Sequence, residues 1–150
     1  MKIIFGEIFI KNSKTFRSNS ATLINSEYVP NVNVVQYAAK KAIKNWRKGK
    51  RISKSISMEI LLYYSATRQI KDALKLGIKD GLNRVVAVVL DTETFSKEIK
   101  FRELEFKPKF NLNKILTHYN ISQQELEIAG IEKIPLLIRE RIALFSIYGG

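Results

Sequence analysis

Cysteine is absent from this chain of 150 residues, and histidine occurs only once. Without cysteine the protein has no disulfide bond, no thiolate metal site and no cysteine nucleophile. The single histidine, His118, excludes a metal site built from several histidines. Because a chain without cysteine suits a reducing compartment, we expect a cytoplasmic protein that binds no metal.

Long apolar runs are missing as well. The longest one, residues 85–90, is far shorter than the roughly 20 residues that cross a bilayer as a helix. Residues 1–10 carry Glu7 and only short apolar runs, so they do not resemble a signal peptide. We therefore expect a soluble protein without a membrane partner.

Signatures of catalysis are also absent from the sequence. It contains no phosphate-binding loop, no dinucleotide fingerprint and no nucleophile elbow. Asp91 and Glu93 follow a valine-rich run, where catalytic carboxylates sometimes lie, but without a partner motif a solvated turn is the favoured interpretation. For His118 we favour a structural or solvated role. We therefore predict that the protein is not an enzyme and binds no cofactor, and we rank an enzyme that uses these three residues lowest.

Positive charge, in contrast, is plentiful. Lys and Arg number 26 against 14 Asp and Glu, which gives a net charge of +12. The segment from Lys40 to Lys54 holds eight of these cations and no acidic residue. Such a cluster repels itself unless an anionic partner compensates, and a polynucleotide backbone is the favoured partner, ahead of an anionic membrane surface. One possible function is therefore a stand-alone RNA- or DNA-binding module without catalytic activity.

The apolar patterns predict a single domain over residues 1–150, of the α/β (α+β) class. The expected architecture is a central mixed β-sheet with flanking helices and a helical C-terminal tail. Gly6 marks a bulge or a close approach of another backbone. The order strand, helix, strand in the middle of the chain favours a crossover unit. Strands are predicted over residues 3–10, 22–29, 58–64, 84–90 and 101–106.

Helical spacing of apolar residues predicts the remaining elements. Asn31 or Asn33 can cap a helix that reaches Lys48 and turns its cations away from the core. Ser122 and Glu125 can form a capping box for a later helix. Further helices are predicted over residues 68–76, 112–119 and 134–147, and a short one from Glu98 before the strand over residues 101–106. The apolar stripe of the first helix consists of Val35, Ala38, Ala39, Ala42 and Trp46.

Residues 65–70, the turn between two predicted elements, bring several hydrogen-bond donors together, and we call this segment the corner. The hydroxyls of Ser65 and Thr67, the Arg68 guanidinium and the free N–H groups of a helix start suit a phosphate oxygen or an unstacked base. The alternative is an ordinary helix cap, with Arg68 paired to Asp72 one turn later. From the residues alone both interpretations stay open.

The predicted C-terminal helix, residues 134–147, is apolar on more than one face, and Pro135 suits its first turn. One face can be buried in the domain. A second face can bind a partner protein or a second copy of the chain. The equal alternative is a helix that is packed entirely in the core.

A resemblance adds to these patterns. Residues 58–78, MEILLYYSATRQIKDALKLGI, resemble the central signature of the KEOPS small-subunit family, whose human member is called the PRPK-binding protein. Residues 38–50 and 140–144 resemble the family's helices on either side, so the resemblance covers nearly the whole chain. Ala66 departs from the pattern, because the family commonly has glycine there. Its methyl group leaves less room for any group that approaches the backbone closely. The lysine- and isoleucine-rich chain looks archaeal.

The resemblance implies a non-catalytic subunit of the KEOPS complex, which makes threonylcarbamoyladenosine in tRNA. Members bind the kinase/ATPase subunit, which sits beside the threonylcarbamoyl transferase subunit, and recruit tRNA through its 3′ CCA end. Carried onto this chain, Arg68 would contact phosphate and Ile70 would contact a splayed base. The expected tRNA-binding residues are Lys44, Arg47, Lys48, Lys50, Arg51, Ser65, Thr67, Arg68, Gln69, Ile70 and Lys71. The expected kinase contacts are Ile138, Ile142, Phe145 and Ile147.

Overall fold

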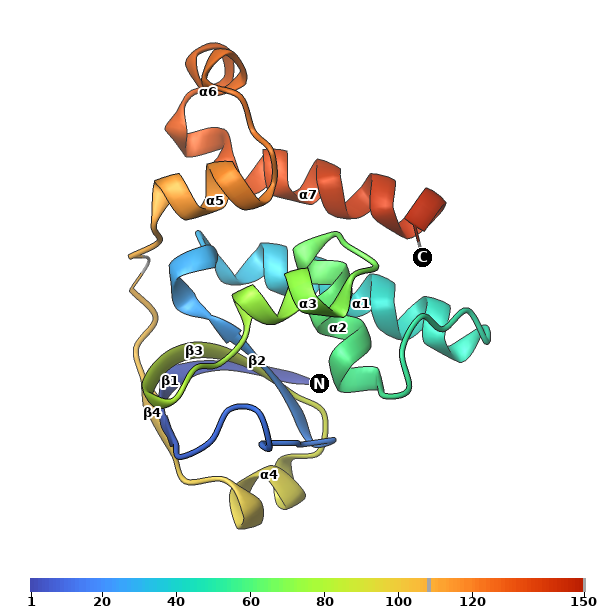
Figure 1. Cartoon of the computed structure of the whole chain (residues 1–150), viewed down its shortest axis with the longest axis vertical. Helices are drawn as coiled ribbons and strands as arrows, with labels where there is room; N and C mark the ends of the chain where they lie inside the picture. The colour runs from blue at the N-terminus through green and yellow to red at the C-terminus, as the bar shows by residue number, and fades with distance from the viewer. Residues whose placement is uncertain (108, 150) are drawn as a thin grey trace.

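Four antiparallel strands form one sheet in the order β2-β3-β1-β4 (Figure 1). This computed structural model describes residues 1–107 and 109–149. β1 (Lys2–Ile10) pairs with β3 (Gly81–Val89) along its whole length and with β4 (Phe101–Leu104) on its other side. β2 (Ala21–Asn25) pairs with the free edge of β3. The predicted class, one sheet flanked by helices with a helical C-terminal tail, is confirmed.

The segment predicted as a strand over residues 58–64 is a helix, α2 (Ile56–Ser65). Ser55 caps it by accepting a hydrogen bond from the Met58 N–H, and residues 59–65 are all buried. A helix that is buried on every side shows the same continuous apolar run as a buried strand, so the pattern could not separate the two. Because that strand does not form, the crossover unit is wrong, and the strand pairs among the described residues are all antiparallel rather than mixed.

α1 (Val32–Arg47) and α2 pack against each other on one face of the sheet (Figure 1). Asn31 caps α1 by accepting a hydrogen bond from the Val34 N–H, and Gly49, whose φ is +82°, lies just past its last turn. Small side chains on the inner side of α1 let α2 come close. The predicted stripe residues that are buried are Val35, Ala38, Ala39 and Ala42.

Three C-terminal helices form a further layer beyond α1 (Figure 1). They are α5 (Leu112–His118), α6 (Gln123–Ala129) and α7 (Ile134–Leu144), and a π-helical turn (Phe145–Gly149) follows α7. The predicted capping box of Ser122 and Glu125 and the predicted place of Pro135 in the first turn of α7 are confirmed. α7 contacts both α1 and α2, so the tail closes the main core.

The opposite face of the sheet is covered by α4 (Thr92–Glu98) and by the loop between β1 and β2 (Figure 1). Phe95 of α4 and Phe16 of the loop pack on a second, smaller core there. The close approach expected at Gly6 is confirmed, because a methyl group at this position would overlap the Arg102 carbonyl oxygen of β4. The bounds of the short helix expected from Glu98 are wrong, because the helix before β4 is α4, which ends at Glu98.

Several predicted elements are shorter in the structure, among them the strand expected over residues 101–106, which is β4, and the helix expected over residues 134–147, which is α7. The strand expected over residues 22–29 ends at Asn25 and continues as a 3₁₀ turn (Ser26–Tyr28). The helix expected over residues 68–76 consists of α3 (Ile70–Ala73) and a 3₁₀ turn (Leu74–Leu76). Another 3₁₀ turn (Ile131–Lys133) precedes α7. Among the helices within residues 1–107 and 109–149, none is long and apolar enough to cross a membrane.

Candidate nucleic-acid interface

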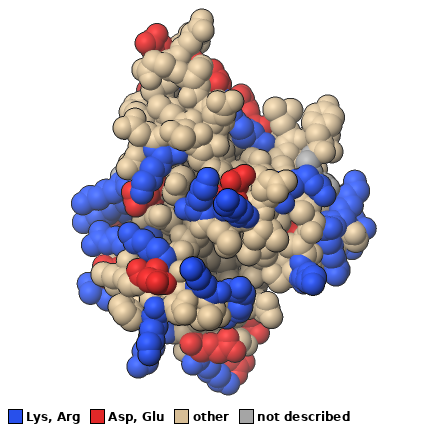
Figure 2. All heavy atoms as spheres, in the orientation of Figure 1, with Lys and Arg blue, Asp and Glu red and all other residues tan. Residues whose placement is uncertain are grey.

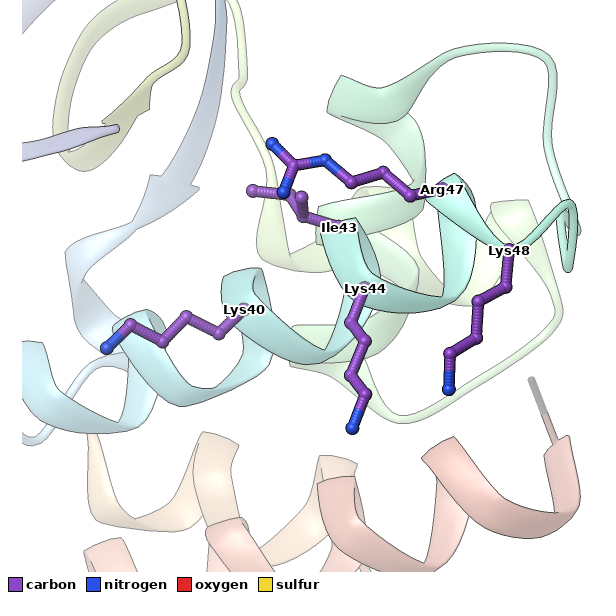
Figure 3. A pocket seen from close by; sticks show the side chains of 5 residues that line it. All are labelled: Lys40, Ile43, Lys44, Arg47 and Lys48. Carbon is purple, nitrogen blue, oxygen red and sulfur yellow. The ribbon is translucent and has the colours of Figure 1, made fainter.

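Five exposed cations surround the C-terminal end of α1, and we call them the basic patch: Lys44, Arg47, Lys48, Lys50 and Arg51. The carbonyl groups at the end of a helix carry partial negative charge, so cations are stable at this position. Lys44 and Lys48 point to one side of α1 and Arg47 to the other (Figure 3). With Lys40 and Ile43 these three residues line an open depression of about 480 Å³.

Arg51 is held against α1 by two contacts with Trp46. Its guanidinium carbon lies 4.1 Å from the centroid of the Trp46 ring, and its Nε donates a hydrogen bond of 3.2 Å to the Trp46 carbonyl oxygen. A guanidinium stacked on an indole keeps its outer N–H groups available while its rotamer is restricted. Arg51 is therefore a partly preorganised cation.

The loop that follows the basic patch is fixed by a buried carboxylate. Glu59, in the first turn of α2, is fully buried. Its Oε2 accepts a hydrogen bond of 2.9 Å from the Ile52 N–H. Its Oε1 accepts one of 2.9 Å from the Ser53 N–H and one of 2.7 Å from the Ser53 hydroxyl. The path of the loop is thereby set by a residue of the core.

A groove of about 550 Å³ begins at this loop, and we call it the apolar groove. The loop between β1 and β2, the loop after α1, and α2 and α3 all contribute to it. Three exposed cations border it, Lys14, Arg17 and Lys54, and the described residues that line it include no Asp or Glu. Its apolar lining comes mainly from Phe16, Ile52, Met58, Leu61, Ile70 and Leu74. Such a groove suits an unstacked base attached to a phosphate backbone.

α3 separates the apolar groove from a second, polar pocket. Ile70 lines the groove, whereas Asp72 and Lys75 line the pocket, which has a volume of about 630 Å³. Ser65 and Thr67 also lie on the polar side. The structure therefore divides the predicted corner of residues 65–70 between two cavities.

Ser65 does not offer the donor that the sequence predicted. It is only 3% exposed, and its hydroxyl donates to the carbonyl oxygens of Leu61 (2.8 Å) and Leu62 (3.2 Å) within α2. The Thr67 hydroxyl accepts a hydrogen bond from the Gln69 N–H. In addition, α3 has only four residues, too few for the helix-start charge that the prediction assumed. The prediction for Ser65 is thus wrong.

The other predicted residues of this corner are exposed: Arg68, Gln69, Ile70 and Lys71. Burial raises the pKa of Tyr63, and the hydrogen bond from Asn45 and the positive charge of Arg68 oppose that rise. The Tyr63 hydroxyl in turn accepts a hydrogen bond from Asn45 of α1. Arg68 is thus an exposed cation of the segment between α2 and α3.

His118 has the structural role that we favoured from the sequence. Its Nε2 lies 2.8 Å from the Ser65 carbonyl oxygen, at the end of α2, and its ring packs edge-on against Tyr28 and Tyr119. Burial lowers the pKa of His118, and the bond to Ser65 opposes this in part. A neutral imidazole that donates to the Ser65 carbonyl satisfies one of the free carbonyls at a helix end.

The charges are unevenly spread over the surface. Figure 2 shows Lys and Arg over the middle of the displayed face and along both its left and its right edge, and the right edge is where α1 ends in the view of Figure 1. The upper part, around α6, shows mostly uncharged atoms and some Asp and Glu. The described residues contain no group of three or more His, Asp or Glu that could hold a metal ion.

The comparison with known families identifies the family of the chain. The family described as kinase binding protein CGI-121 matches residues 8–145. The chain belongs to this family. It is the family of the KEOPS small subunit that the sequence resembles, and the match runs from β1 to the end of α7. No curated protein matches the chain.

For a member of the CGI-121 family, the apolar tail is the second surface of interest. Ile138, Ile142 and Phe145 lie in the main core. There the Phe145 ring packs edge-on against the Tyr63 ring, with 5.1 Å between the ring centroids. The prediction that these three side chains contact a kinase directly is therefore wrong. Ile147 is 70% exposed, as that role requires, and its exposed apolar neighbours are Leu144 and Tyr148.

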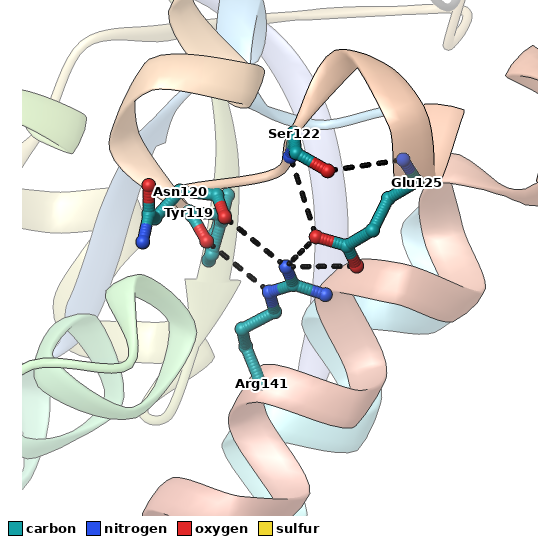
Figure 4. A network of polar contacts seen from close by, with 5 residues as sticks. All are labelled: Tyr119, Asn120, Ser122, Glu125 and Arg141. Carbon is teal, nitrogen blue, oxygen red and sulfur yellow. Dashed lines mark hydrogen bonds and ion pairs between the residues drawn. The ribbon is translucent and has the colours of Figure 1, made fainter. Parts of the chain in front are cut away.

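Arg141 fixes α7 to the link between α5 and α6 (Figure 4). Its guanidinium donates to the carbonyl oxygens of Tyr119 (3.1 Å) and Asn120 (3.3 Å). It also binds the Glu125 carboxylate at 2.9 Å and 3.1 Å. Arg141 lowers the pKa of Glu125, with help from the Ser122 N–H. These contacts hold the three C-terminal helices in one arrangement.

Proposed function

We propose that the chain is a non-catalytic subunit of the KEOPS complex for threonylcarbamoyladenosine modification, and that it binds the kinase/ATPase subunit and recruits tRNA by its 3′ CCA end. The observation that carries this proposal is the CGI-121 family match over residues 8–145 in a chain whose basic patch adjoins an apolar groove. Through the kinase, the threonylcarbamoyl transferase subunit is an indirect partner.

The single-stranded 3′ end is assigned to the apolar groove. Bases without a pairing partner bind by stacking on apolar side chains, while cations neutralise the adjoining phosphates. Ile70 and Ile52 supply apolar surface, and Lys14, Arg17 and Lys54 supply charge. This keeps the expected role of Ile70 and moves the site away from Ser65.

The acceptor stem is assigned to the basic patch. Exposed lysines and arginines bind the phosphate backbone in a salt-dependent manner and do not read sequence. Arg68 and Gln69 just before α3 and Lys71 within it are exposed, and they stay assigned to phosphate and base edges at the entrance of the groove. Thr67, which is half-buried on the polar side, stays assigned as a weaker contact.

The kinase contact is assigned to the end of the tail, with Ile147 at its centre and Leu144 and Tyr148 beside it. The support is their exposure: 70%, 59% and 83% of the respective residues face solvent. Large apolar side chains clustered at a surface are typical of protein interfaces. The buried residues of α7 would then support this surface from beneath rather than touch the kinase.

Trimming the CCA end tests the tRNA part. Intact tRNA should bind more tightly than the same tRNA without its 3′ CCA, and Ile70→Asp should remove most of that difference. Ile128→Asp makes the same change at an exposed position of α6, away from the groove, and should keep the difference. Equal affinities of the wild-type protein for both tRNAs would refute recognition of the end.

The kinase part is tested by co-purification with the kinase subunit. Ile147→Glu should abolish binding, whereas Ile128→Glu, at an apolar residue of α6 that is 81% exposed, should retain it. Both variants place one carboxylate at an exposed apolar position, so both should fold. Retention of the kinase by Ile147→Glu would show that the interface lies elsewhere.

A further inference from the structure

Glu59 is a carboxylate with no exposed surface, in a helix whose other buried residues are mostly apolar. A buried charge is stable only when hydrogen bonds replace its lost hydration. In Glu59 these bonds come from the Ile52 N–H and from the N–H and hydroxyl of Ser53, all within the loop after α1. The residue thus stabilises a loop at the surface from inside the core.

That loop joins the two parts of the candidate interface. Arg51 of the basic patch comes directly before the two anchored residues, and Lys54 of the apolar groove comes directly after them. Ile52 and Ser53 themselves line the groove. Two successive N–H groups bound by one carboxylate fix the direction of the backbone between these two cations.

We propose that Glu59 is a positioning residue for RNA binding, which sets the distance between the basic patch and the apolar groove without touching RNA. The inference rests on the proposed recognition of the tRNA 3′ end. It predicts that neutralising Glu59 weakens RNA binding, which is the opposite of what net charge alone predicts. Neutralising Glu59 makes the chain more positive, so charge alone predicts tighter binding of a polyanion.

Binding of intact and CCA-trimmed tRNA by Glu59→Gln separates the two effects. We expect affinity for intact tRNA to fall by about tenfold, by analogy with residues that orient metal ligands from behind. Binding of trimmed tRNA should change little, because the exposed cations remain. The matched control is Glu93→Gln, an exposed residue of α4 whose replacement changes the net charge equally and should not weaken binding. A folded Glu59→Gln protein that keeps the wild-type preference for the intact end overturns the proposal.

Ser53→Ala provides a second test that does not alter the buried charge. It removes the hydroxyl, which also lies 3.0 Å from the Ser55 carbonyl oxygen, but the protein keeps the two N–H bonds to Glu59 and should fold. We expect faster hydrogen exchange at the Ile52 and Ser53 amides and a smaller loss of preference for the intact end. Unchanged exchange and preference in this variant overturn the proposal even if Glu59→Gln does not fold. A wild-type protein without any preference for the intact end instead refutes the proposed function itself.

Discussion

At the end of α1 the surface consists of exposed cations, whereas at the end of α7 it consists of exposed apolar side chains. The first region is organised by polar contacts, the Arg51 stack on Trp46 and the loop bonds to Glu59. The second is organised by burial, because Ile138 and Ile142 hold α7 in the core while Ile147 stays outside. The difference predicts that salt will weaken RNA binding but not kinase binding.

The largest effect is expected when a buried residue of α7 is truncated. Ile138→Ala should lower the free energy of unfolding by about 2–5 kcal/mol, because it leaves a cavity in a fully buried position. Ile147→Ala should leave stability nearly unchanged, since that side chain is mostly exposed. Denaturant unfolding of both variants measures the contrast. Equal losses in both would mean that the tail is packed differently.

A smaller loss of stability is expected when the polar link of the tail is removed. Arg141→Ala should lower the unfolding midpoint by less than Ile138→Ala, because it removes hydrogen bonds to Tyr119, Asn120 and Glu125 but leaves the apolar core intact. The matched control is Glu140→Ala, at an exposed position of the same helix. A midpoint equal to that of the control would show that the link contributes nothing to stability.

Charge reversal in the basic patch should act on RNA binding alone. Lys44→Glu combined with Lys48→Glu should reduce the slope of log affinity against log salt by about one for each phosphate that the protein no longer binds. Affinity for CCA-trimmed tRNA should fall as much as affinity for intact tRNA, since these residues do not line the groove. Kinase co-purification should be unaffected. A loss of affinity confined to intact tRNA would contradict the division between stem and end.

The smallest effect is expected from the titration of His118. Its pKa in the folded protein lies below the usual 6.5, so the unfolded chain takes up the proton first as the pH falls. The folded state should therefore lose stability below about pH 6.5, and no other histidine contributes. His118→Gln keeps a donor for the Ser65 carbonyl but does not titrate. Thermal unfolding between about pH 7.5 and about pH 5.5 should shift less in this variant than in the wild type.

The elements with a clear period or cap could be predicted from the sequence. The strand β1, the alanine stripe of α1 and the capping box at Ser122 each follow from local rules that tertiary packing does not override. The basic patch was predictable for a similar reason, since eight cations without a carboxylate cannot be buried.

Features that depend on neighbours in space could not be predicted. The apolar run of α2 fits a buried strand as well as a buried helix. Because it forms a helix, it does not join the sheet, whose strand pairs among the described residues are antiparallel. The sequence does not show that the Ser65 hydroxyl donates to the carbonyl oxygens of Leu61 and Leu62, because these carbonyls come within reach only when the segment is helical. The apolar groove joins loops far apart in the chain, so Lys14 and Arg17 carried no local signal of their role.

The contact between Arg51 and Trp46 has a practical consequence. Trp46 is the only tryptophan of the chain, and a cation of the basic patch lies over its ring. Any polyanion that draws this guanidinium away, or shields it, changes the local field on the indole. Fluorescence from the unmodified protein should therefore report occupancy of this region without an added dye, and a ligand confined to the tail should leave the emission unaltered.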